Sequence, residues 1–344
     1  MQWVIFLKNA FIISGVFISG LIGAGFATGS EIYFYFSRYA NKGYLGIVLS
    51  SFLFALLQYE IITQSHRLSA HTIDEYLSKI MPKGLAAITG VFTYVFMLFI
   101  LSAMLSGFGE MLYYLWGIKK SAGALIMLLV TAFIISKGYN IFIKSESIFF
   151  VMIILIMAGV FAYLYYSFTP EIQAFSAADS WELSAVSYTG YNMLTGAAVL
   201  CMLSKSAEKK TTLAASAVTF SILTVIMCAA GGTILMYSKT LSYVSMPIVE
   251  ICKSCSAPLS AIYSAAVFLS MLTTAISTGY PLKEFICTVP PLKRYSCIMY
   301  AAAYLISGMQ FSFIVDKLYR ISGIISIIFL FFILKEKFIN KLIS

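Results

Sequence analysis

Long uncharged stretches dominate the pattern of hydrophobic and polar positions along this chain. The few charged residues divide it into ten such stretches, at 9–30, 43–59, 84–109, 121–136, 147–170, 183–204, 211–238, 254–282, 295–315 and 321–334. A helix needs about 20 mostly apolar residues to cross a bilayer, and flanking charged side chains can reach the interface from a shorter span. The pattern therefore predicts ten transmembrane helices within a single membrane domain, residues 1–344.

The first stretch contains a run of glycines that a continuous helix does not favour, Ile22-Gly23-Ala24-Gly25-Phe26-Ala27-Thr28-Gly29-Ser30-Glu31. Glycine tolerates non-helical dihedral angles and leaves room for a ligand beside the backbone. Backbone polar groups that are freed inside lipid are costly unless protein, water, an ion or a substrate pairs with them. We therefore expect a ligand site at this break. The alternative is that these glycines only allow close helix packing.

A second irregular segment, Tyr188–Gly196, lies inside the sixth stretch. Two halves of five helices, each starting with a broken helix, enter the membrane from opposite sides because five is odd. Paired interrupted helices at corresponding places are typical of the binding site of a secondary transporter. The expected fold is an all-α polytopic membrane protein whose ten helices form a five-plus-five inverted repeat with helices 1 and 6 broken. Repeat one covers about 1–167, an outer loop about 168–183, and repeat two about 184–344.

Composition and charge agree with a membrane protein and add its orientation. Hydrophobic residues make up 60% of the chain and charged residues 11%, whereas a globular domain has about 25% charged residues. If the N-terminus is cytoplasmic, 15 of the 23 lysines and arginines fall on inner segments. This bias predicts a multi-pass protein of the cell membrane with both termini in the cytoplasm.

The same bias identifies the partners that the sequence favours. It accounts for the net charge of +9, because the basic residues face the anionic inner leaflet and do not cluster as a nucleic-acid surface would. Membrane lipid and a small-molecule substrate are therefore the expected partners. Nucleic acid is not expected, and nothing in the sequence identifies a protein partner.

The motif Gly23-Ala24-Gly25-Phe26 resembles the glycine signature in the first helix of the amino acid–polyamine–organocation superfamily, whose members have the leucine-transporter (LeuT) fold. The longer run that ends at Glu31 is most similar to the YkvI-type branch, as are Tyr191-Asn192, Phe311, Leu318-Tyr319 and Gly323. The resemblance implies that helices 1 and 6 unwind around a substrate between helices 3 and 8. The amides near Ala24, Gly25 and Phe26 would then receive an anionic substrate group such as a carboxylate.

Selectivity is expected from side chains that line the cavity between the two breaks. Asn192 is the first candidate, because its amide can both donate and accept hydrogen bonds beside unwound backbone. The other candidates are Tyr188 and Gly190 on helix 6, and Tyr94 and Ser102 on helix 3. The alternative for the polar and aromatic side chains is packing within the bundle or contact with lipid.

Hydroxyl side chains gather on helix 8, in Ser270-Met271-Leu272-Thr273-Thr274. In sodium-coupled members of the resembled superfamily, two hydroxyl residues at this place join main-chain carbonyls of helix 1. Carried over, the resemblance implies a sodium ion held by Ser19, Ile22, Ser270, Thr273 and Thr274. The alternative is that these hydroxyls bond only to their own helix or a neighbour. Proton coupling is the main rival, although the centre of helix 5, Phe149–Ala162, lacks the lysine that replaces sodium in some relatives.

Glu31 has three alternative roles at membrane depth. The spacing of Thr28-Gly29-Ser30-Glu31 is that of a capping box, in which Thr28 caps the second half-helix and Glu31 bonds back to it. An outer gate would pair Glu31 with Lys317 or Arg320 at the start of helix 10. An ionisable residue in a membrane is also a candidate for carrying protons.

These patterns favour transport over catalysis. The sequence contains no nucleophile elbow or phosphate loop, so an enzyme is not expected, and no cofactor is predicted other than sodium as a coupling ion. The favoured function is secondary active transport of a small organic solute, an amino acid or related zwitterion, by alternating access. The alternatives are a proton-coupled transporter, a ligand-sensing membrane subunit like those of spore germinant receptors, and a channel, which the lack of an evident filter disfavours.

Overall fold

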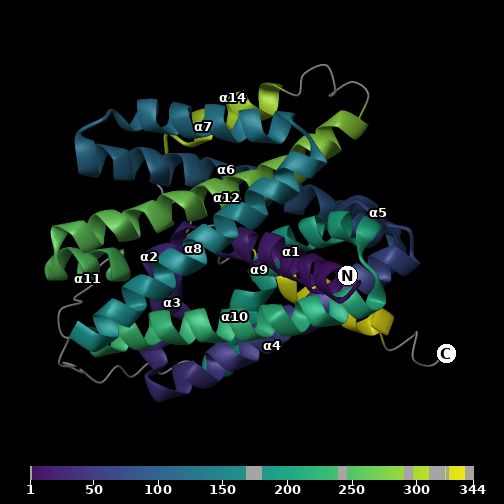
Figure 1. Cartoon of the computed structure of the whole chain (residues 1–344). Helices are drawn as coiled ribbons and strands as arrows, with labels where there is room; N and C mark the ends of the chain where they lie inside the picture. The colour runs from purple at the N-terminus through teal and green to yellow at the C-terminus, as the bar shows by residue number, and fades with distance from the viewer. Residues whose placement is uncertain are drawn as a thin grey trace.

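The computed structural model describes residues 2–167, 180–238, 246–289, 297–309, 322 and 325–337, and nearly all of these residues are helical (Figure 1). These residues contain no β-strand. The helices are α1 (Gln2–Leu21), α2 (Ala24–Thr28), α3 (Ser30–Tyr35), α4 (Asn41–Arg67), α5 (Ile73–Ile80), α6 (Lys83–Trp116), α7 (Lys120–Ser136), α8 (Tyr139–Ser167), α9 (Trp181–Leu203), α10 (Lys209–Met236), α11 (Pro247–Cys255), α12 (Ala257–Thr288) and α14 (Cys297–Ile306). A further helix covers 325–337.

Five of these helices are long and apolar enough to cross a membrane, namely α4, α6, α8, α10 and α12. Shorter apolar helices cover Ile5–Leu21, Lys120–Ser136 and Cys297–Ile306. Each of the ten predicted stretches contains helix among the described residues, but only five reach the length and hydropathy of a span by themselves. Ten spans therefore stay a prediction.

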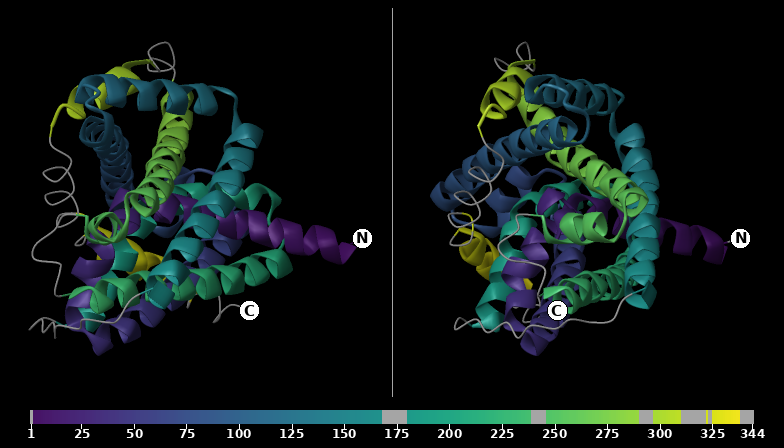
Figure 2. Two further views of the ribbon diagram at one scale, coloured as in Figure 1. Left: turned by 60° about the vertical axis from the view of Figure 1, so that its left-hand side comes forward. Right: turned by 90° about the vertical axis from the view of Figure 1, so that its left-hand side faces the viewer.

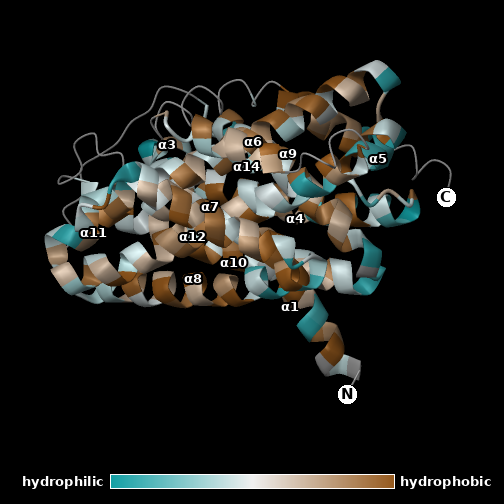
Figure 3. Ribbon diagram, turned by 90° about the horizontal axis from the view of Figure 1, so that it is seen from above, coloured by the Kyte–Doolittle hydropathy of each residue, from teal (hydrophilic) through white to brown (hydrophobic). Residues whose placement is uncertain are grey.

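Hydrophobic residues, brown in Figure 3, are frequent along the outer helices, and many of their large side chains are exposed. Leu155 on α8 is 68% exposed and Ile88 on α6 is 66% exposed. A water-soluble protein of this size rarely exposes so many large apolar side chains together. Lipid contact explains this surface. The first turns of α1 project from the body of the protein (Figure 2), and Trp3 there is 74% exposed.

The helices form two groups with α1 between them (Figures 1 and 2). In the first group α4 packs against α9 and α10, and in the second group α6 packs against α7, α12 and α14. The helix α1 contacts α9 and α10 of the first group and α12 of the second, while α8 packs against α1, α10 and α12. An inverted repeat would give such pairs, because α4 and α10 are the second helices of the two halves and α6 and α12 the third. The repeat and its boundaries stay a prediction.

The predicted break in helix 6 is wrong, because α9 runs without interruption through Tyr188–Gly196. Polar side chains in this segment bond back to their own helix. Thr189 Oγ1 donates to the Ala185 carbonyl at 3.0 Å, and Asn192 Nδ2 donates to the Tyr188 carbonyl at 3.0 Å. Such bonds satisfy the side chains without opening the backbone.

Both glycines of this segment serve close packing. A Cβ atom on Gly190 would lie 2.5 Å from Ser326 Oγ, on the helix 325–337. A Cβ atom on Gly196 would lie 3.0 Å from Phe17 Cε2, on α1. Small residues let membrane helices approach one another closely, which accounts for these glycines without a break.

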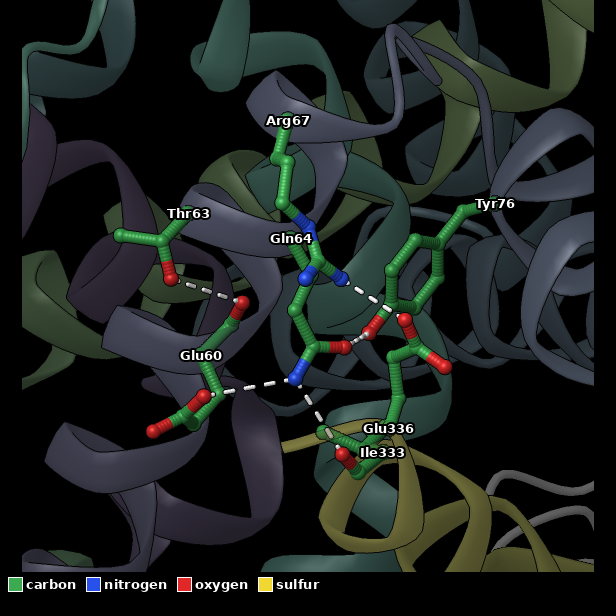
Figure 4. Close-up of polar contacts among 7 residues, drawn as sticks. All are labelled: Glu60, Thr63, Gln64, Arg67, Tyr76, Ile333 and Glu336. Atoms are coloured by element: carbon green, nitrogen blue, oxygen red, sulfur yellow. Dashed lines mark hydrogen bonds and ion pairs between the residues drawn. The ribbon is translucent and has the colours of Figure 1, made fainter. Parts of the chain in front are cut away.

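A network of polar side chains joins α4, α5 and the helix 325–337 (Figure 4). Tyr76 OH donates to Gln64 Oε1 at 2.7 Å, and Gln64 Nε2 donates to Glu60 Oε2 at 3.3 Å and to the Ile333 carbonyl at 3.2 Å. A buried polar group without a partner is costly, so these bonds fix the three elements relative to one another. Two ion pairs also join α4 to the helix 325–337, Arg67–Glu336 at 2.7 Å and Lys337–Glu60 at 2.8 Å.

Candidate functional site

The helical path of the first span is interrupted between Leu21 and Ala24, a place we call the α1–α2 break. Gly23 has an extended backbone, with φ −84° and ψ −172°, and its N–H donates to the Leu21 carbonyl at 2.9 Å. The Ala27 N–H donates to the Gly23 carbonyl at 2.9 Å. The amides of Ala24–Phe26 donate to no backbone carbonyl within the described part of the chain. Each of these three buried donors therefore needs a side chain, a water molecule or a ligand as its acceptor.

A second irregularity follows at Gly29, between α2 and α3. Its backbone is left-handed, with φ +86° and ψ −3°, and its N–H donates to the Phe26 carbonyl at 3.0 Å. A Cβ atom on Gly29 would also lie 2.7 Å from Ile248 Cγ1 on α11. Both the dihedral angles and the close approach require glycine at this position.

The capping box predicted for Thr28-Gly29-Ser30-Glu31 is wrong. The residue before the first turn of α3 is Gly29, which has no side chain that can cap it. Thr28 is the last residue of α2, and its Oγ1 donates to the Ala24 carbonyl at 2.8 Å. The threonine hydroxyl therefore donates backward, as it does within a helix, and α3 has no side-chain cap.

Glu31 is buried at the start of α3, with 7% of its surface exposed. Its side chain lies against Gly25, because a Cβ atom on Gly25 would lie 2.7 Å from both Cγ and Cδ of Glu31. Lys317 and Arg320, the predicted gate partners, lie outside the described residues. The gate therefore stays a prediction.

Tyr263 of α12 holds the short helix α2 in place. Its hydroxyl donates to the Ala27 carbonyl at 2.6 Å, and the side chain is fully buried. In a continuous helix this carbonyl would accept from the amide four residues later, but the turn at Gly29 removes that bond. The tyrosine therefore replaces a backbone hydrogen bond that the irregular path loses.

Replacing Tyr263 by phenylalanine is expected to destabilise the protein by about 1–3 kcal/mol, because it leaves the Ala27 carbonyl buried without a donor. The measurement is the thermal unfolding midpoint of the purified protein. Tyr166→Phe is the matched control, since Tyr166 is 90% exposed. An unchanged midpoint in Tyr263→Phe would mean that the carbonyl does not depend on this hydroxyl.

Three of the predicted sodium ligands are in direct contact. Thr273 Oγ1 of α12 lies 3.0 Å from the Ser19 carbonyl oxygen of α1 and 3.0 Å from the Ser270 carbonyl oxygen. Ser19, Ser270 and Thr273 are all fully buried. Carbonyl and hydroxyl oxygens are ligands that hard cations take in proteins.

The other two predicted ligands lie next to this contact. Thr274 Oγ1 is buried and has no hydrogen-bond partner among the described residues. It lies beside the α1–α2 break, because a Cβ atom on Gly23 would be 3.2 Å from it. Ile22 is the residue between Leu21 and Gly23, and its N–H donates to the Ile18 carbonyl at 2.9 Å. The unpaired hydroxyl and the oxygen-only donor set fit a sodium ion.

Glu146 on α8 is a residue of this site that the sequence analysis missed. It is fully buried, and its Oε2 lies within hydrogen-bond distance of Ser19 Oγ. The sequence prediction for helix 5 concerned a lysine within Phe149–Ala162, and this carboxylate lies one turn before that range. The sequence did contain a signal for Glu146, because this acidic residue directly precedes the long uncharged stretch 147–170.

Tyr94, predicted to line the substrate cavity, lies far from the α1–α2 break. Its hydroxyl donates to Asp74 Oδ2 of α5 at 2.7 Å, and its ring stacks on Phe285 at a centroid distance of 3.9 Å. Phe285 follows Thr273 by more than three turns of α12, which is about 18 Å along the helix axis. Burial raises the pKa of the Asp74 carboxyl, and the hydrogen bond from Tyr94 opposes this rise.

The Tyr94–Asp74 pair lines a cavity of about 250 Å³ between α5, α6, α9 and α12. Glu75, Lys205 and Glu284 also line it. The cavity is large enough for a small organic molecule, and its walls carry charges of both signs. It lies at the α5 end of the bundle, near the polar network of Figure 4.

The remaining predicted substrate contacts make bonds within the bundle. Ser102 Oγ donates to the Leu98 carbonyl at 2.7 Å. Tyr188 packs among aromatic rings, with centroid distances of 5.0 Å to Phe36 and 5.8 Å to Phe54. Asn192 bonds to the Tyr188 carbonyl of its own helix, and Gly190 lies against Ser326. A substrate role for these residues stays a prediction.

One curated protein and several solved structures are similar to this chain, although no family model matches it. The chain is 25% identical over 338 residues to the uncharacterised membrane protein YkvI of Bacillus subtilis (strain 168), and the match covers 94% of each chain. The predicted resemblance to the YkvI-type branch is thus confirmed.

Three solved transporters share its architecture. MhsT in complex with L-phenylalanine has a TM-score of 0.69 at 13% identity, with 92% of this chain and 85% of that chain covered. A Na+-coupled sialic acid symporter in a substrate-bound outward-open state has a TM-score of 0.66 at 13% identity, with coverage of 92% and 76%. A mutant manganese transporter of Eremococcus coleocola has a TM-score of 0.63 at 14% identity, with coverage of 94% and 77%.

All three of these structures are transporters and none is an enzyme. At identities of 13–14% the likeness concerns the fold. The protein is therefore a membrane protein with the LeuT fold, similar in sequence to YkvI.

Proposed function

We propose that this protein is a secondary active transporter of a small organic solute, an amino acid or a related zwitterion. The observation that carries the proposal is the α1–α2 break, where three amides without a backbone acceptor lie beside the hydroxyl groups of α12. Unpaired backbone groups at membrane depth are stable only when a ligand or water satisfies them. The shared fold with transporters of different solutes supports the class of function.

The substrate carboxylate binds, in this proposal, to the amides of Ala24–Phe26. These amides have no backbone acceptor within the described residues, and an anion is the ligand that backbone N–H groups favour. Asn192, Tyr188 and Ser102 are the candidates for contacts with the rest of the solute. The bonds that Asn192 and Ser102 make to their own helices leave their side-chain oxygens able to accept another hydrogen bond.

Sodium is the coupling ion of the proposal, and its ligands are Ser19, Ile22, Ser270, Thr273 and Thr274. The contacts among Ser19, Ser270 and Thr273 and the unpaired hydroxyl of Thr274 support this assignment. A Na+-coupled symporter among the structures of the same fold gives it further support. The ion and the solute would bind on two sides of the same break, which provides their coupling.

Alternating access follows from the position of α1 between the two helix groups. The group of α1, α4, α9 and α10 tilts against the group of α6, α7, α12 and α14, and the break lets the two parts of the first span move separately. If both termini face the cytoplasm, the polar network of Figure 4 and the 250 Å³ cavity lie on the inner side. The cavity then provides a path for solute release.

Uptake by the purified protein in proteoliposomes tests this function. Radiolabelled amino acids, first selected by their effect on thermal unfolding, are expected to accumulate when sodium is higher outside than inside. Accumulation that requires a proton gradient and no sodium would support the proton-coupled alternative. Binding without accumulation under either gradient would contradict transport and support a ligand-sensing subunit.

A further inference from the structure

Glu146 carries a carboxyl group inside the bundle that no positive charge of the described residues balances. Its exposed fraction is 0%, and it lies on α8 where this helix packs against α1. The ion pairs of the described residues do not include it, and its Oε1 has no hydrogen-bond partner there. A buried carboxylate is strongly destabilised unless a cation or several donors compensate its charge.

Ser19 supplies this carboxylate with at most one hydrogen. The Ser19 hydroxyl lies within hydrogen-bond distance of Glu146 Oε2 and also 3.0 Å from the Val16 carbonyl oxygen. A hydroxyl has a single hydrogen to divide between two acceptors, whereas a carboxylate accepts about four hydrogen bonds. Glu146 is therefore short of donors, which is the condition that favours binding of a cation.

Ser19 also connects Glu146 to the oxygen atoms of α12. Its carbonyl oxygen lies 3.0 Å from Thr273 Oγ1, while its hydroxyl contacts the carboxylate. Thr274, the next residue of α12, is 5% exposed and has the hydroxyl without a partner among the described residues. Oxygen atoms of three helices, α1, α8 and α12, are thus connected through one serine.

We propose that Glu146 is the anionic ligand of a monovalent cation site centred on Ser19, and that the cation is sodium. This inference rests on the proposed function and deepens it, because it adds a charged ligand to a predicted set that has only neutral oxygens. One carboxylate balances one positive charge, whereas a divalent ion would keep an uncompensated charge inside the membrane. The described residues contain no group of three His, Cys, Asp or Glu that could hold such an ion.

Thermal unfolding of the purified full-length protein tests this site independently of transport. The unfolding midpoint of the wild-type protein is expected to rise when sodium chloride replaces choline chloride at constant ionic strength. In Glu146→Gln the rise should vanish or need about tenfold more sodium. The midpoint of this variant in choline should equal or exceed that of the wild type, because an uncompensated buried charge is gone.

Two further variants complete the test. Glu110→Gln is the matched control, because Glu110 lies on α6 and pairs with Lys120 at 3.6 Å, and it should keep the wild-type sodium response. Glu146→Asp keeps the charge on a shorter side chain and should bind radiolabelled sodium more weakly than the wild type. If Glu146→Gln does not fold, the binding of radiolabelled sodium by Glu146→Asp tests the proposal instead. Wild-type sodium affinity in Glu146→Asp would then overturn it.

A wild-type sodium response in Glu146→Gln would also overturn the proposal. So would a wild-type protein that is stabilised by calcium or by acid but not by sodium. If the double variant Thr273→Val, Thr274→Val loses sodium binding while Glu146→Gln keeps it, only the role of Glu146 fails. If sodium binds as expected but no solute accumulates in proteoliposomes, the proposed transport function fails and the cation site stands.

Discussion

Replacing Gly25 by valine is expected to reduce solute uptake at least about tenfold, because overpacking costs about 1–3 kcal/mol at a site that must admit a ligand. A Cβ atom at this position would lie 2.7 Å from Cγ and Cδ of Glu31, and valine adds two methyl groups beyond it. The side chain would displace Glu31 and cover the amides of Ala24–Phe26. Initial rates of uptake into proteoliposomes measure the effect.

Gly159→Val is the matched control for this substitution. Gly159 lies on α8, and no atom beyond the backbone of its own helix turn lies within 4 Å of a Cβ built there. The control should therefore keep its expression, unfolding midpoint and uptake. Wild-type uptake by Gly25→Val would show that the solute does not bind at the α1–α2 break.

The second large effect is expected from replacing Thr273 and Thr274 together by valine. Valine has the shape of threonine without its hydroxyl, so the change removes two oxygen atoms and leaves the packing nearly intact. Loss of ligand oxygens at a cation site should weaken sodium binding by about tenfold or more. The measurement is the dependence of uptake, and of the unfolding midpoint, on sodium concentration.

Thr278→Val is the control, because Thr278 Oγ1 donates to the Thr274 carbonyl at 2.7 Å within the same helix. This variant should keep its sodium dependence. If the double variant Thr273→Val, Thr274→Val responds to sodium as the wild type does, the α12 hydroxyls are not ligands. Their contacts with Ser19 would then serve helix packing alone.

Hydrophobic patterning predicted the course of the chain well, because the cost of charge in a membrane is large and local. The uncharged stretches contain helices, the glycine motif at Gly23–Phe26 indicated the LeuT fold, and the longer run that ends at Glu31 indicated the likeness to YkvI. The contact of Thr273 with Ser19 is a long-range one, and only the resemblance suggested it. The spacing of hydroxyl residues along α12 does not specify which neighbouring helix these residues face.

The prediction of a second break, in α9, is wrong for a physical reason that the sequence does not reveal. Gly190 and Gly196 face Ser326 and Phe17, so their lack of a side chain serves packing, whereas Gly29 serves a left-handed turn. The sequence does not distinguish a glycine needed for packing from a glycine needed for a turn. The residue that a packing glycine contacts is distant in sequence. Glu146 was missed in a similar way, because its importance depends on Ser19 of another helix.

A structure of the protein determined with sodium and a transported solute tests the central claim most directly. We predict that the carboxylate of the solute lies within hydrogen-bond distance of the amides of Ala24–Phe26, and that sodium lies among the oxygen atoms of Ser19, Thr273 and Thr274. A first helix that runs unbroken from Leu21 to Thr28, or a solute bound away from this break, would contradict the account.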